Sequence, residues 1–595
     1  MMVPAAAAWR LATAALALAA AAAAGVDAAR PPSDTRLGGD GAERLEPGGA
    51  AAPPPALRQP ADAALRQPAD AAAVHTVHLL FSHHLDVGLD IGLKLTEDCV
   101  GFATKIVQRY FDDFIPRAIR LGRQMEAGPD KFAYTIHPWI ASLYVDCVPW
   151  YTPDSCPLNP GRLRCPDKAA VAQFDEAVAK GWLLWADSPM NLDSGVVGEP
   201  GMFEDLLDIA GALNERYNIS KPARVWSNVD VPGFSRSSIP LLRRAGANFL
   251  SIGENGHLDG GGGPSGNSST PLEVVGDRNA TLFRWHDPVS TQELVVMHHR
   301  GYGGYSRPDA CLITPGGVAL ASHFASDNTG PPLSVSEVRQ VFNTVRKVFP
   351  NAKVFGSTFD QFAAEIKAAE IAALPVMSSE WGDQWLTGMS TDPVRLATYR
   401  AIARARATCI DSGACHRREP VLRNLTRFAA KISEHTQGLQ NEAWSPGVPG
   451  CTMPDGSFQS PCPEPGDSHW SNEAFHQVHN VLHNAFKGAD DSWIEARLFN
   501  TLAIEAVPPS HPLAPLLQKE LAALVPHLPA TPLPPRRTAS KFSEPVVCGA
   551  AGMAEKVTMS FDPMSGSVRQ LGFGKGGAWS ELMDLRYITY SAYSS

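Results

Sequence analysis

The sequence predicts an α/β protein in which helices cover a parallel sheet, most simply a barrel, followed by a helical domain. Three observations lead to this prediction. Apolar strand-like segments alternate with amphipathic segments over about 300 residues, the pattern turns helical from residue 377, and strand-like segments return near the C-terminus. We therefore assign the barrel to residues 74–376, a helical bundle to 377–527, and a Pro-rich linker with an incomplete β domain to 528–595.

The alternation of strands and helices defines the barrel region. Short apolar runs predict strands at VHTVHLLF (74–81), RVWSNVD (224–230), NFLSIG (248–253) and AKVFG (352–356). Apolar residues at helical spacing predict helices at residues 99–125, 237–246, 334–350 and 358–369. In parallel α/β proteins of this kind, catalytic residues gather at the carboxyl ends of the strands.

The later segments differ in their pattern. Asp392 and Pro393 are a typical N-cap and first helical residue for a helix at 391–407, and further helices are predicted at 420–435 and 472–486. Beyond the Pro-rich stretch, residues 556–571 predict two short strands joined by a turn at Gly566. The sequence stops soon after this hairpin, so we expect the last domain to be truncated.

The N-terminal residues predict entry into the secretory pathway. Residues 1–29 have the composition of a cleaved signal peptide, with one arginine before a Leu/Ala run, and residues 30–73 form an Ala/Pro-rich disordered linker. No later stretch is apolar enough to span a bilayer, so no membrane anchor is expected after cleavage. The expected location is the secretory lumen or the cell exterior.

Glycosylation motifs and cysteines suit the same compartment. Sequons occur at Asn218, Asn267, Asn279 and Asn424. The ten cysteines are compatible with disulfides, and two pairs, Cys409–Cys415 and Cys451–Cys462, could close short loops. A third cluster consists of Cys147, Cys156 and Cys165. The sequence leaves the pairing open, and free buried thiols remain an alternative.

The composition excludes one class of partner. The net charge is −10, and no basic block is present, which argues against a nucleic-acid-binding protein. The acidity is spread along the chain and indicates solubility rather than a recognition tail. The oligomeric state is left open.

Histidines and aspartates interrupt the apolar pattern at three places. His84 and Asp86 follow the first strand and project from one face, while His83 points the other way. Asp230 follows a second strand, and His435 continues the apolar stripe of a predicted helix. A His-x-Asp pair supplies half of a zinc shell. The alternatives are a solvated pair, an ordinary turn aspartate and a core histidine, respectively.

The order of several motifs resembles glycoside hydrolase family 38, the α-mannosidase family, and is similar above all to an uncharacterised branch of its relatives. The motifs that carry the resemblance are HLDVG (84–88), SNVDVPGFS (227–235), GDQWLTGMSTDPVRLATYR (382–400), SEHTQG (433–438) and SFDPMSGSVRQL (560–571). This resemblance implies a seven-stranded (β/α) barrel of the glycoside hydrolase/deacetylase type, a helical bundle and the start of a β-sandwich. It also implies a carbohydrate substrate.

The resemblance further implies a zinc ion bound by His84, Asp86, Asp230 and His435. In the family, the aspartate that matches Asp230 also attacks the anomeric carbon and forms a covalent glycosyl-enzyme. Zinc can keep such a carboxylate ionised and oriented. A second carboxyl then acts as acid and base. Asp327 is preferred to Glu254 for this role, although each also fits a loop carboxylate.

Departures from the family pattern affect sugar recognition rather than metal binding. Leu89 replaces an aromatic residue, Val231 and Pro232 replace Pro-Phe, and Thr436 replaces an aspartate that binds sugar hydroxyls. Zinc ligation is therefore expected, whereas preference for mannose is not implied. Glu434 precedes His435, but adjacent residues of a helix face different directions, so no joint role is predicted.

Three functions follow from these observations. The first is a zinc-dependent retaining glycoside hydrolase. The second is a zinc-dependent carbohydrate deacetylase or polysaccharide lyase, which the unassigned general acid would favour. The third is a non-catalytic glycan-binding protein on a degenerate hydrolase scaffold, which the three changed sugar-contacting positions would favour.

Overall fold

The computed structural model describes part of the chain, and the following paragraphs concern that part alone. The described residues are 71–88, 102–150, 162–231, 234–254, 281–299, 301–325, 327–379, 392–436, 451–452, 458–459, 496–525, 546–548, 557–561, 568–573 and 577–583. The predicted signal peptide, nearly all of the linker and the predicted helix at 472–486 lie outside these residues.

The first sheet is built around β1 (Thr76–His83). β1 pairs in parallel with β9 (Val318–Ala325) along its whole length, and on its other edge with β10 (Lys353–Ser357) and then with β2 (Tyr134–Ile136). β3 (Leu183–Trp185) extends the sheet beyond β2, and β8 (Leu312–Ile313) runs antiparallel to β9. β1 is buried from Val77 onward, which explains its nearly continuous apolar sequence.

The second sheet has the order β11-β6-β7-β5-β4. Its strands are β4 (Val225–Asp230), β5 (Phe249–Glu254), β6 (Thr281–His286), β7 (Glu293–His299) and β11 (Val376–Met377). All neighbours are parallel except β6 and β7. The prediction of an α/β protein with parallel strands is confirmed.

A closed seven-stranded barrel, in contrast, is not observed among the described strands of residues 76–377, which form two separate sheets. Between β3 and β4, polar side chains take the place of a continuous ladder. The Asp187 carboxylate accepts a hydrogen bond from Val225 N at 3.1 Å, and the Asn191 amide oxygen accepts one from Val229 N at 3.0 Å. One main-chain bond, from Asp187 N to Val225 O, also links the two sheets.

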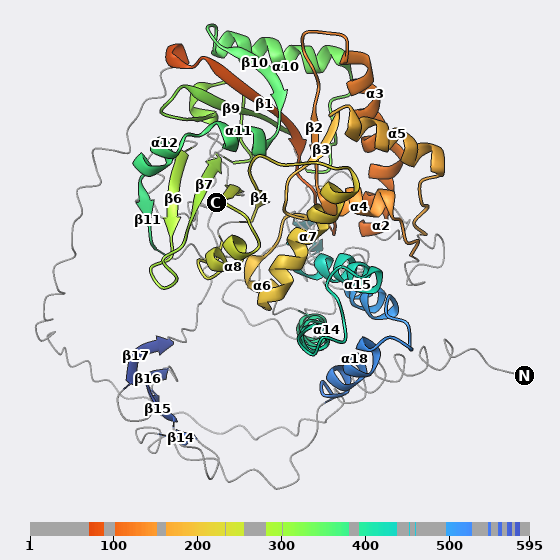
Figure 1. Ribbon diagram of the computed structural model, residues 1–595, viewed down its shortest axis with the longest axis vertical. Coiled ribbons are helices and arrows are strands. Elements are labelled where there is room, and N and C mark those ends of the chain that lie inside the picture. Colours follow the sequence, from red (N-terminus) through yellow and green to blue (C-terminus); the bar gives the residue numbers. More distant parts are fainter. Residues whose placement is uncertain are drawn as a thin grey trace, which may run out of the picture. The chain divides into compact units, whose positions relative to one another are not determined.

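Helices flank both sheets (Figure 1). The helical elements of this region are α2 (Phe102–Arg109), the π-helical turn η2 (Tyr110–Phe114), α3 (Ile115–Met125), α4 (Pro138–Val145), α5 (Lys168–Ala179), α6 (Ser194–Val197), α7 (Pro200–Arg216), α8 (Ser238–Arg244), α10 (Val335–Val348), α11 (Phe359–Glu365) and α12 (Ala368–Ala373), with short 3₁₀ turns η1 (Ala71–Ala73) and η3 (Pro308–Ala310). α10 is typical: Ser334 caps it, and one face buries Val338, Val341, Phe342 and Val345.

The described residues 392–436 and 496–525 are mainly helical, in agreement with the predicted helical pattern. α14 (Pro393–Asp411) begins where Asp392 accepts a hydrogen bond from Arg395 N at 3.1 Å, which confirms the predicted cap. α14 packs on α18 (Leu513–Ala522), and α15 (Pro420–Ala430) packs on α7. Residues 496–505 are also helical. The 3₁₀ turn η4 (Lys431–Ser433) follows α15 directly.

Short antiparallel strands make up the described C-terminal part. β12 (Cys451–Thr452) pairs with β13 (Phe458–Gln459). A four-stranded sheet contains β14 (Val546–Cys548), β15 (Val557–Phe561), β16 (Val568–Phe573) and β17 (Gly577–Met583) in that order. The pairing of β15 with β16 agrees with the predicted hairpin.

Two disulfides join cysteines that the sequence analysis had grouped together. Cys147 pairs with Cys165, and Cys409 pairs with Cys415. Cys311 is buried and unpaired. In the described part of the chain, no helix has the length and apolar character needed to cross a membrane. The two disulfides are compatible with the expected secretion.

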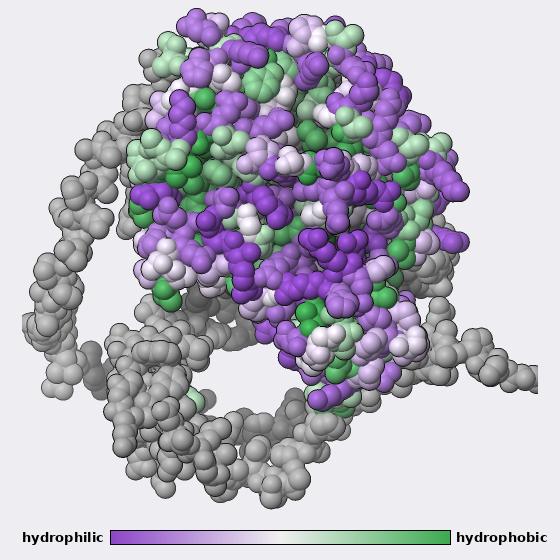
Figure 2. Space-filling view, viewed as in Figure 1, coloured by the Kyte–Doolittle hydropathy of each residue, from purple (hydrophilic) through white to green (hydrophobic). Residues whose placement is uncertain are grey.

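The surface offers no extended apolar area on the face shown in Figure 2. Polar residues dominate that view, with small apolar patches between them. The large hydrophobic side chains that are exposed come from different elements: Val289, Leu333, Val376, Val394 and Val525. Isolated exposed residues of this kind need no partner to explain them.

Candidate metal centre

Two strand ends supply three of the predicted ligands. His84 and Asp86 lie immediately beyond β1, and Asp230 is the last residue of β4. All three side chains are buried. The sequence analysis placed them at carboxyl ends of parallel strands, and the structure places them there.

Asp230 has a positive φ, which is uncommon for residues other than glycine. Its φ is +81°, in the left-handed region that L-amino acids other than asparagine, aspartate and glycine seldom adopt. Such a conformation costs about 1–3 kcal/mol and is found preferentially at functional sites.

His435 reaches the same place by a route that the sequence analysis got wrong. The predicted helix was expected to include His435, but α15 ends at Ala430 and η4 ends at Ser433. The chain then forms a short antiparallel bridge to the segment after β3, between Glu434 and Leu192. His435 N donates to Asn191 O at 3.2 Å within this bridge, which fixes the histidine beside the strand ends. A main-chain partner therefore replaces the helix as the support of His435.

Four side-chain atoms converge at the centre of the site. His84 Nε2 lies 2.8 Å from Asp86 Oδ1 and 3.6 Å from Asp230 Oδ2. His435 Nε2 lies 3.0 Å from Asp86 Oδ1 and 3.1 Å from Asp230 Oδ2. The two Nε2 atoms are 3.2 Å apart. The four residues thus form a buried group that could hold a metal ion.

These distances match the dimensions of a tetrahedral zinc shell. Zinc bonds to histidine and carboxylate ligands measure about 2.0–2.1 Å, so the edge of a regular tetrahedron of ligand atoms measures about 3.3–3.4 Å. The five distances above range from 2.8 to 3.6 Å around that value. Calcium is a poorer fit, because it prefers six to eight oxygen ligands at longer distances.

The charges within the group stabilise one another and shift the pKa values of all four side chains. Burial alone would raise the pKa of Asp86 and of Asp230, but His84 and His435 outweigh it and lower both pKa values to about 2. Burial alone would lower the pKa of His84, but Asp86 and Asp230 raise it. Burial also opposes protonation of His435, yet Glu434 and the two aspartates raise its pKa well above the ordinary value. The raised pKa values of the two histidines and the lowered pKa values of the two aspartates thus have the same cause, the attraction between opposite charges inside the group.

A tyrosine that the sequence analysis missed connects Asp230 with Asp327. The Tyr302 hydroxyl donates a hydrogen bond to Asp230 Oδ1. Asp327 lies close enough for its pKa to respond to the site: burial raises it, and Asp86 and Asp230 add to this rise, although His84 and Tyr302 oppose it. Among the described carboxyl groups beside the site, Asp327 is thus the one whose pKa moves upward. The sequence signal for Tyr302 was weak, because RGYGGY resembles an ordinary loop.

Asn328 attaches the turn that contains Asp327 to the first strand end. Its side chain accepts a hydrogen bond from Asp86 N at 3.2 Å and donates one to Asp86 O at 3.0 Å. Asn328 N also donates to His84 O at 3.0 Å. Asp327 is therefore held beside the ligands by main-chain and side-chain bonds of its neighbour. The alternative candidate, Glu254, has a side chain outside the described part of the structure.

A buried ion pair contacts His435 through the Nδ1 atom of its ring. Lys431 Nζ lies 2.7 Å from Glu434 Oε2, and the two side chains are only 2% and 0% exposed. Glu434 Oε1 lies 2.9 Å from His435 Nδ1. Because the chain is not helical here, Glu434 and His435 do act together, contrary to the sequence prediction. The overlooked signal was Lys431, a charged residue directly after the apolar end of α15 and now buried in η4.

Thr436 joins this support to the first strand end. Its hydroxyl lies 2.6 and 2.8 Å from the two oxygens of Glu434, and 2.7 Å from Gly88 N, which donates to it. A Cβ atom at Gly88 would lie 2.6 Å from Thr436 O, so the close approach requires glycine. The residue that departs from the family pattern therefore has a structural role in this chain.

The raised pKa values of His84 and His435 predict a pH-dependent metal affinity. A metal ion must displace their protons, so the apparent affinity should rise by up to about tenfold per pH unit and per displaced proton between pH 5.5 and 8. The stability of the metal-free protein, in contrast, should fall as the pH rises above 6.5. The raised pKa of His435 stabilises it fully below pH 6.5 and progressively less above, while Asp86 and Asp230 stabilise it above pH 3.8. Zinc titrations across this range, with melts in chelator, test this, and an affinity that falls with rising pH contradicts it.

Comparison with known proteins identifies no family for this chain. No family model and no curated protein sequence matches it. Among solved structures, it is similar to a glycosyl hydrolase family 38 protein from Enterococcus faecalis, with 9% identity, a TM-score of 0.37, and coverage of 71% of this chain and 40% of the other. It is also similar to a 4-alpha-glucanotransferase from Thermococcus litoralis, with 7% identity, a TM-score of 0.35, and coverage of 83% and 64%. The chain thus spans less than two thirds of either protein, and these TM-scores do not establish a shared fold.

Proposed function

We propose that the chain is a zinc-dependent retaining glycoside hydrolase of the α-mannosidase type that acts on a glycan. The observation that carries the proposal is the pair of opposite pKa shifts beside the four converging ligands. The pKa of Asp230 falls to about 2, whereas that of Asp327 rises. One carboxylate and one carboxylic acid in a single site are what retaining glycoside hydrolysis requires.

Each residue has a defined role in this mechanism. His84, Asp86, Asp230 and His435 would hold zinc, which when bound would supply positive charge that favours the ionised form of Asp230. Asp230 attacks the anomeric carbon and forms a glycosyl ester. Asp327 donates a proton to the departing oxygen and then removes one from the incoming water. Tyr302 orients Asp230 by donating a hydrogen bond to Oδ1.

One contact sets a condition on metal binding. The Asn191 amide nitrogen lies 3.0 Å from His84 Nδ1, while the amide oxygen accepts a hydrogen bond from Val229 N. A metal at Nε2 leaves the proton of His84 on Nδ1, which then needs an acceptor. Binding therefore requires the Asn191 amide to turn its oxygen toward His84, at the expense of its bond to Val229.

The first test is the metal content of the purified protein. Elemental analysis should find about one zinc per chain, as a single tetrahedral site requires. His435→Ala should lose it, whereas His75→Ala, which changes an exposed histidine, should keep it. A folded protein without zinc, even after zinc has been supplied, overturns the proposal.

The second test separates the three classes of function. Aryl glycosides and acetylated sugars should be assayed together, with the configuration of the first released sugar followed by NMR. Release of a sugar with retained configuration supports the proposal. Release of acetate alone identifies a deacetylase, and glycan binding without any turnover identifies a binding protein.

A further inference from the structure

Two of the four sequons lie in the described part of the chain, and their surroundings differ. Asn218 begins the sequon Asn-Ile-Ser after the end of α7, and Asn424 begins Asn-Leu-Thr within α15. An oligosaccharide on the amide nitrogen needs an exposed side chain with free space around it. The two sites can therefore be compared residue by residue.

Asn218 meets this requirement. It follows the C-cap residue Tyr217 and has a φ of +52°, with Asn218 N bonded to Glu215 O at 3.2 Å and Ile219 N bonded to Asn214 O at 2.8 Å. This is the pattern of a Schellman helix end with asparagine at the left-handed position. The turn presents Asn218 and Ser220 as exposed residues, while Ile219 between them packs against the core.

The Schellman turn alone accounts for an asparagine at this position, because asparagine tolerates a positive φ. It does not account for Ser220, which is exposed and contributes nothing to the helix end. The two explanations can be separated experimentally, since glycine suits the turn as well as asparagine does but offers no amide to modify.

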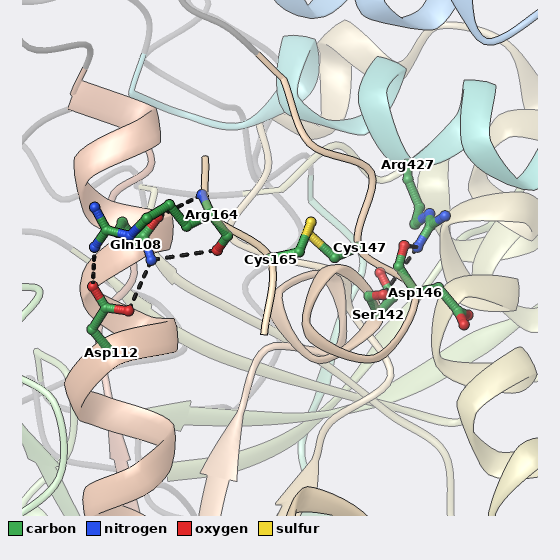
Figure 3. The surroundings of a disulfide bond; sticks show 8 residues. All are labelled: Gln108, Asp112, Ser142, Asp146, Cys147, Arg164, Cys165 and Arg427. Carbon is green, nitrogen blue, oxygen red and sulfur yellow. Dashed lines mark hydrogen bonds and ion pairs between the residues drawn. A yellow bond between two sulfur atoms is a disulfide. The ribbon is translucent and has the colours of Figure 1, made fainter. Parts of the chain in front are cut away.

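Asn424 fails the requirement. Its side-chain oxygen accepts a hydrogen bond from the guanidinium of Arg427, and Thr426, the third residue of its sequon, is only 5% exposed. Figure 3 shows Arg427 directed at the C-terminal end of α4, beside the Cys147–Cys165 disulfide. There its Nη1 donates to Ser142 O at 2.9 Å and to Asp146 O at 3.0 Å. The Asn424 amide is therefore held against the Arg427 guanidinium and beside a buried Thr426, rather than directed freely into solvent.

We infer that Asn218 is an N-glycosylation site and that Asn424 is not modified in the folded protein. In the reaction, a bond forms between Asn218 Nδ2 and the anomeric carbon of an oligosaccharide carried on a lipid diphosphate. The bond from that carbon to the diphosphate oxygen breaks, the lipid diphosphate leaves, and the amide proton passes to a base of the oligosaccharyltransferase. The inference is independent of any catalytic activity of this chain.

The test uses the full chain expressed in a eukaryotic secretory host. Glycopeptides of the purified, folded protein are analysed by mass spectrometry before and after treatment with peptide N-glycosidase. The peptide that contains Asn218 should carry a glycan, and the peptide that contains Asn424 should not. Asn218→Gly and Ser220→Ala should both abolish the modification, whereas Ser220→Thr should retain it.

Either of two results overturns the inference. One is an unmodified Asn218, whether the protein is recovered from the medium or remains in the cytosol because it is not exported. The other is a glycan on Asn424 in protein that is folded by its thermal melt. Ser220→Ala leaves the helix end untouched, so it keeps the test valid if Asn218→Gly impairs folding.

Discussion

Replacing Asp230 by asparagine is expected to reduce kcat/KM for aryl glycosides by about 10⁴-fold, the scale seen when a catalytic carboxylate is removed from an enzyme. Asparagine is nearly isosteric and tolerates the φ of +81°. The loss should therefore report on the missing nucleophile and charge rather than on a distorted backbone. The assay should contain excess zinc, because the substitution also removes a ligand.

Two further variants make this result specific. Asp360→Asn changes another buried aspartate, one whose charged neighbours are Lys221 and Asp187, and should leave turnover nearly unchanged. Asp327→Asn should slow glycosides with poor leaving groups far more than those with activated aryl groups, since only the former need a general acid. Full activity of Asp230→Asn, or an Asp327 effect independent of the leaving group, contradicts the assigned roles.

Replacing Lys431 by methionine is expected to lower the free energy of unfolding by about 3–5 kcal/mol, because it leaves the buried Glu434 carboxylate without its cation. Burial alone would raise the pKa of Glu434, and Lys431 and His435 together lower it to about 2. The double variant Lys431→Met, Glu434→Gln removes both charges and should recover most of the lost stability. Chemical denaturation of the full chain measures both effects.

Metal affinity distinguishes a positioning role of Glu434 from a merely structural one. Glu434→Gln should weaken zinc binding by about 10–100-fold, the usual effect of removing the carboxylate that supports a ligating histidine. The control is the Lys180–Glu126 pair, which has the same 2.7 Å separation but is about half exposed. Lys180→Met should change neither stability nor zinc affinity appreciably, since exposed pairs contribute little. Equal effects of Lys431→Met and Lys180→Met contradict the assignment.

The sequence was informative where local pattern and chemistry coincide. The apolar runs before His84 and Asp230 predicted strands, and their polar ends predicted a site, because a buried strand rarely ends in such residues without a ligand or partner. Asp392 before Pro393 predicted the start of α14 for the same local reason. These features depend on a few neighbouring residues and can be predicted without the rest of the chain.

Features that depend on distant partners were not predictable. The spacing of apolar residues predicted a helix that includes His435. Instead, the segment at 434–435 forms a β-bridge and a main-chain hydrogen bond with Leu192 and Asn191. The Glu434–His435 pair was dismissed on the assumption of a helix. The role of Tyr302 depends on the hydrogen bond from its hydroxyl to Asp230, a residue 72 positions earlier, so no local sequence pattern predicts it. Asp187 takes part in replacing the strand pairing between β3 and β4, but nothing in the sequence around it indicates that the barrel is incomplete.

The separation of the ligands along the chain has a consequence for biosynthesis. His435 follows Asp230 by 205 residues, which a ribosome adds in about 10–40 s at ordinary rates. During that interval the nascent chain contains three of the four side chains and lacks the segment that closes the site. Discrimination among divalent ions must wait until residues 431–436 dock on residues 191–193. Selective metal binding would then begin only after the residues up to 436 have been synthesised, and a retained ion would mark a chain in which this segment has docked.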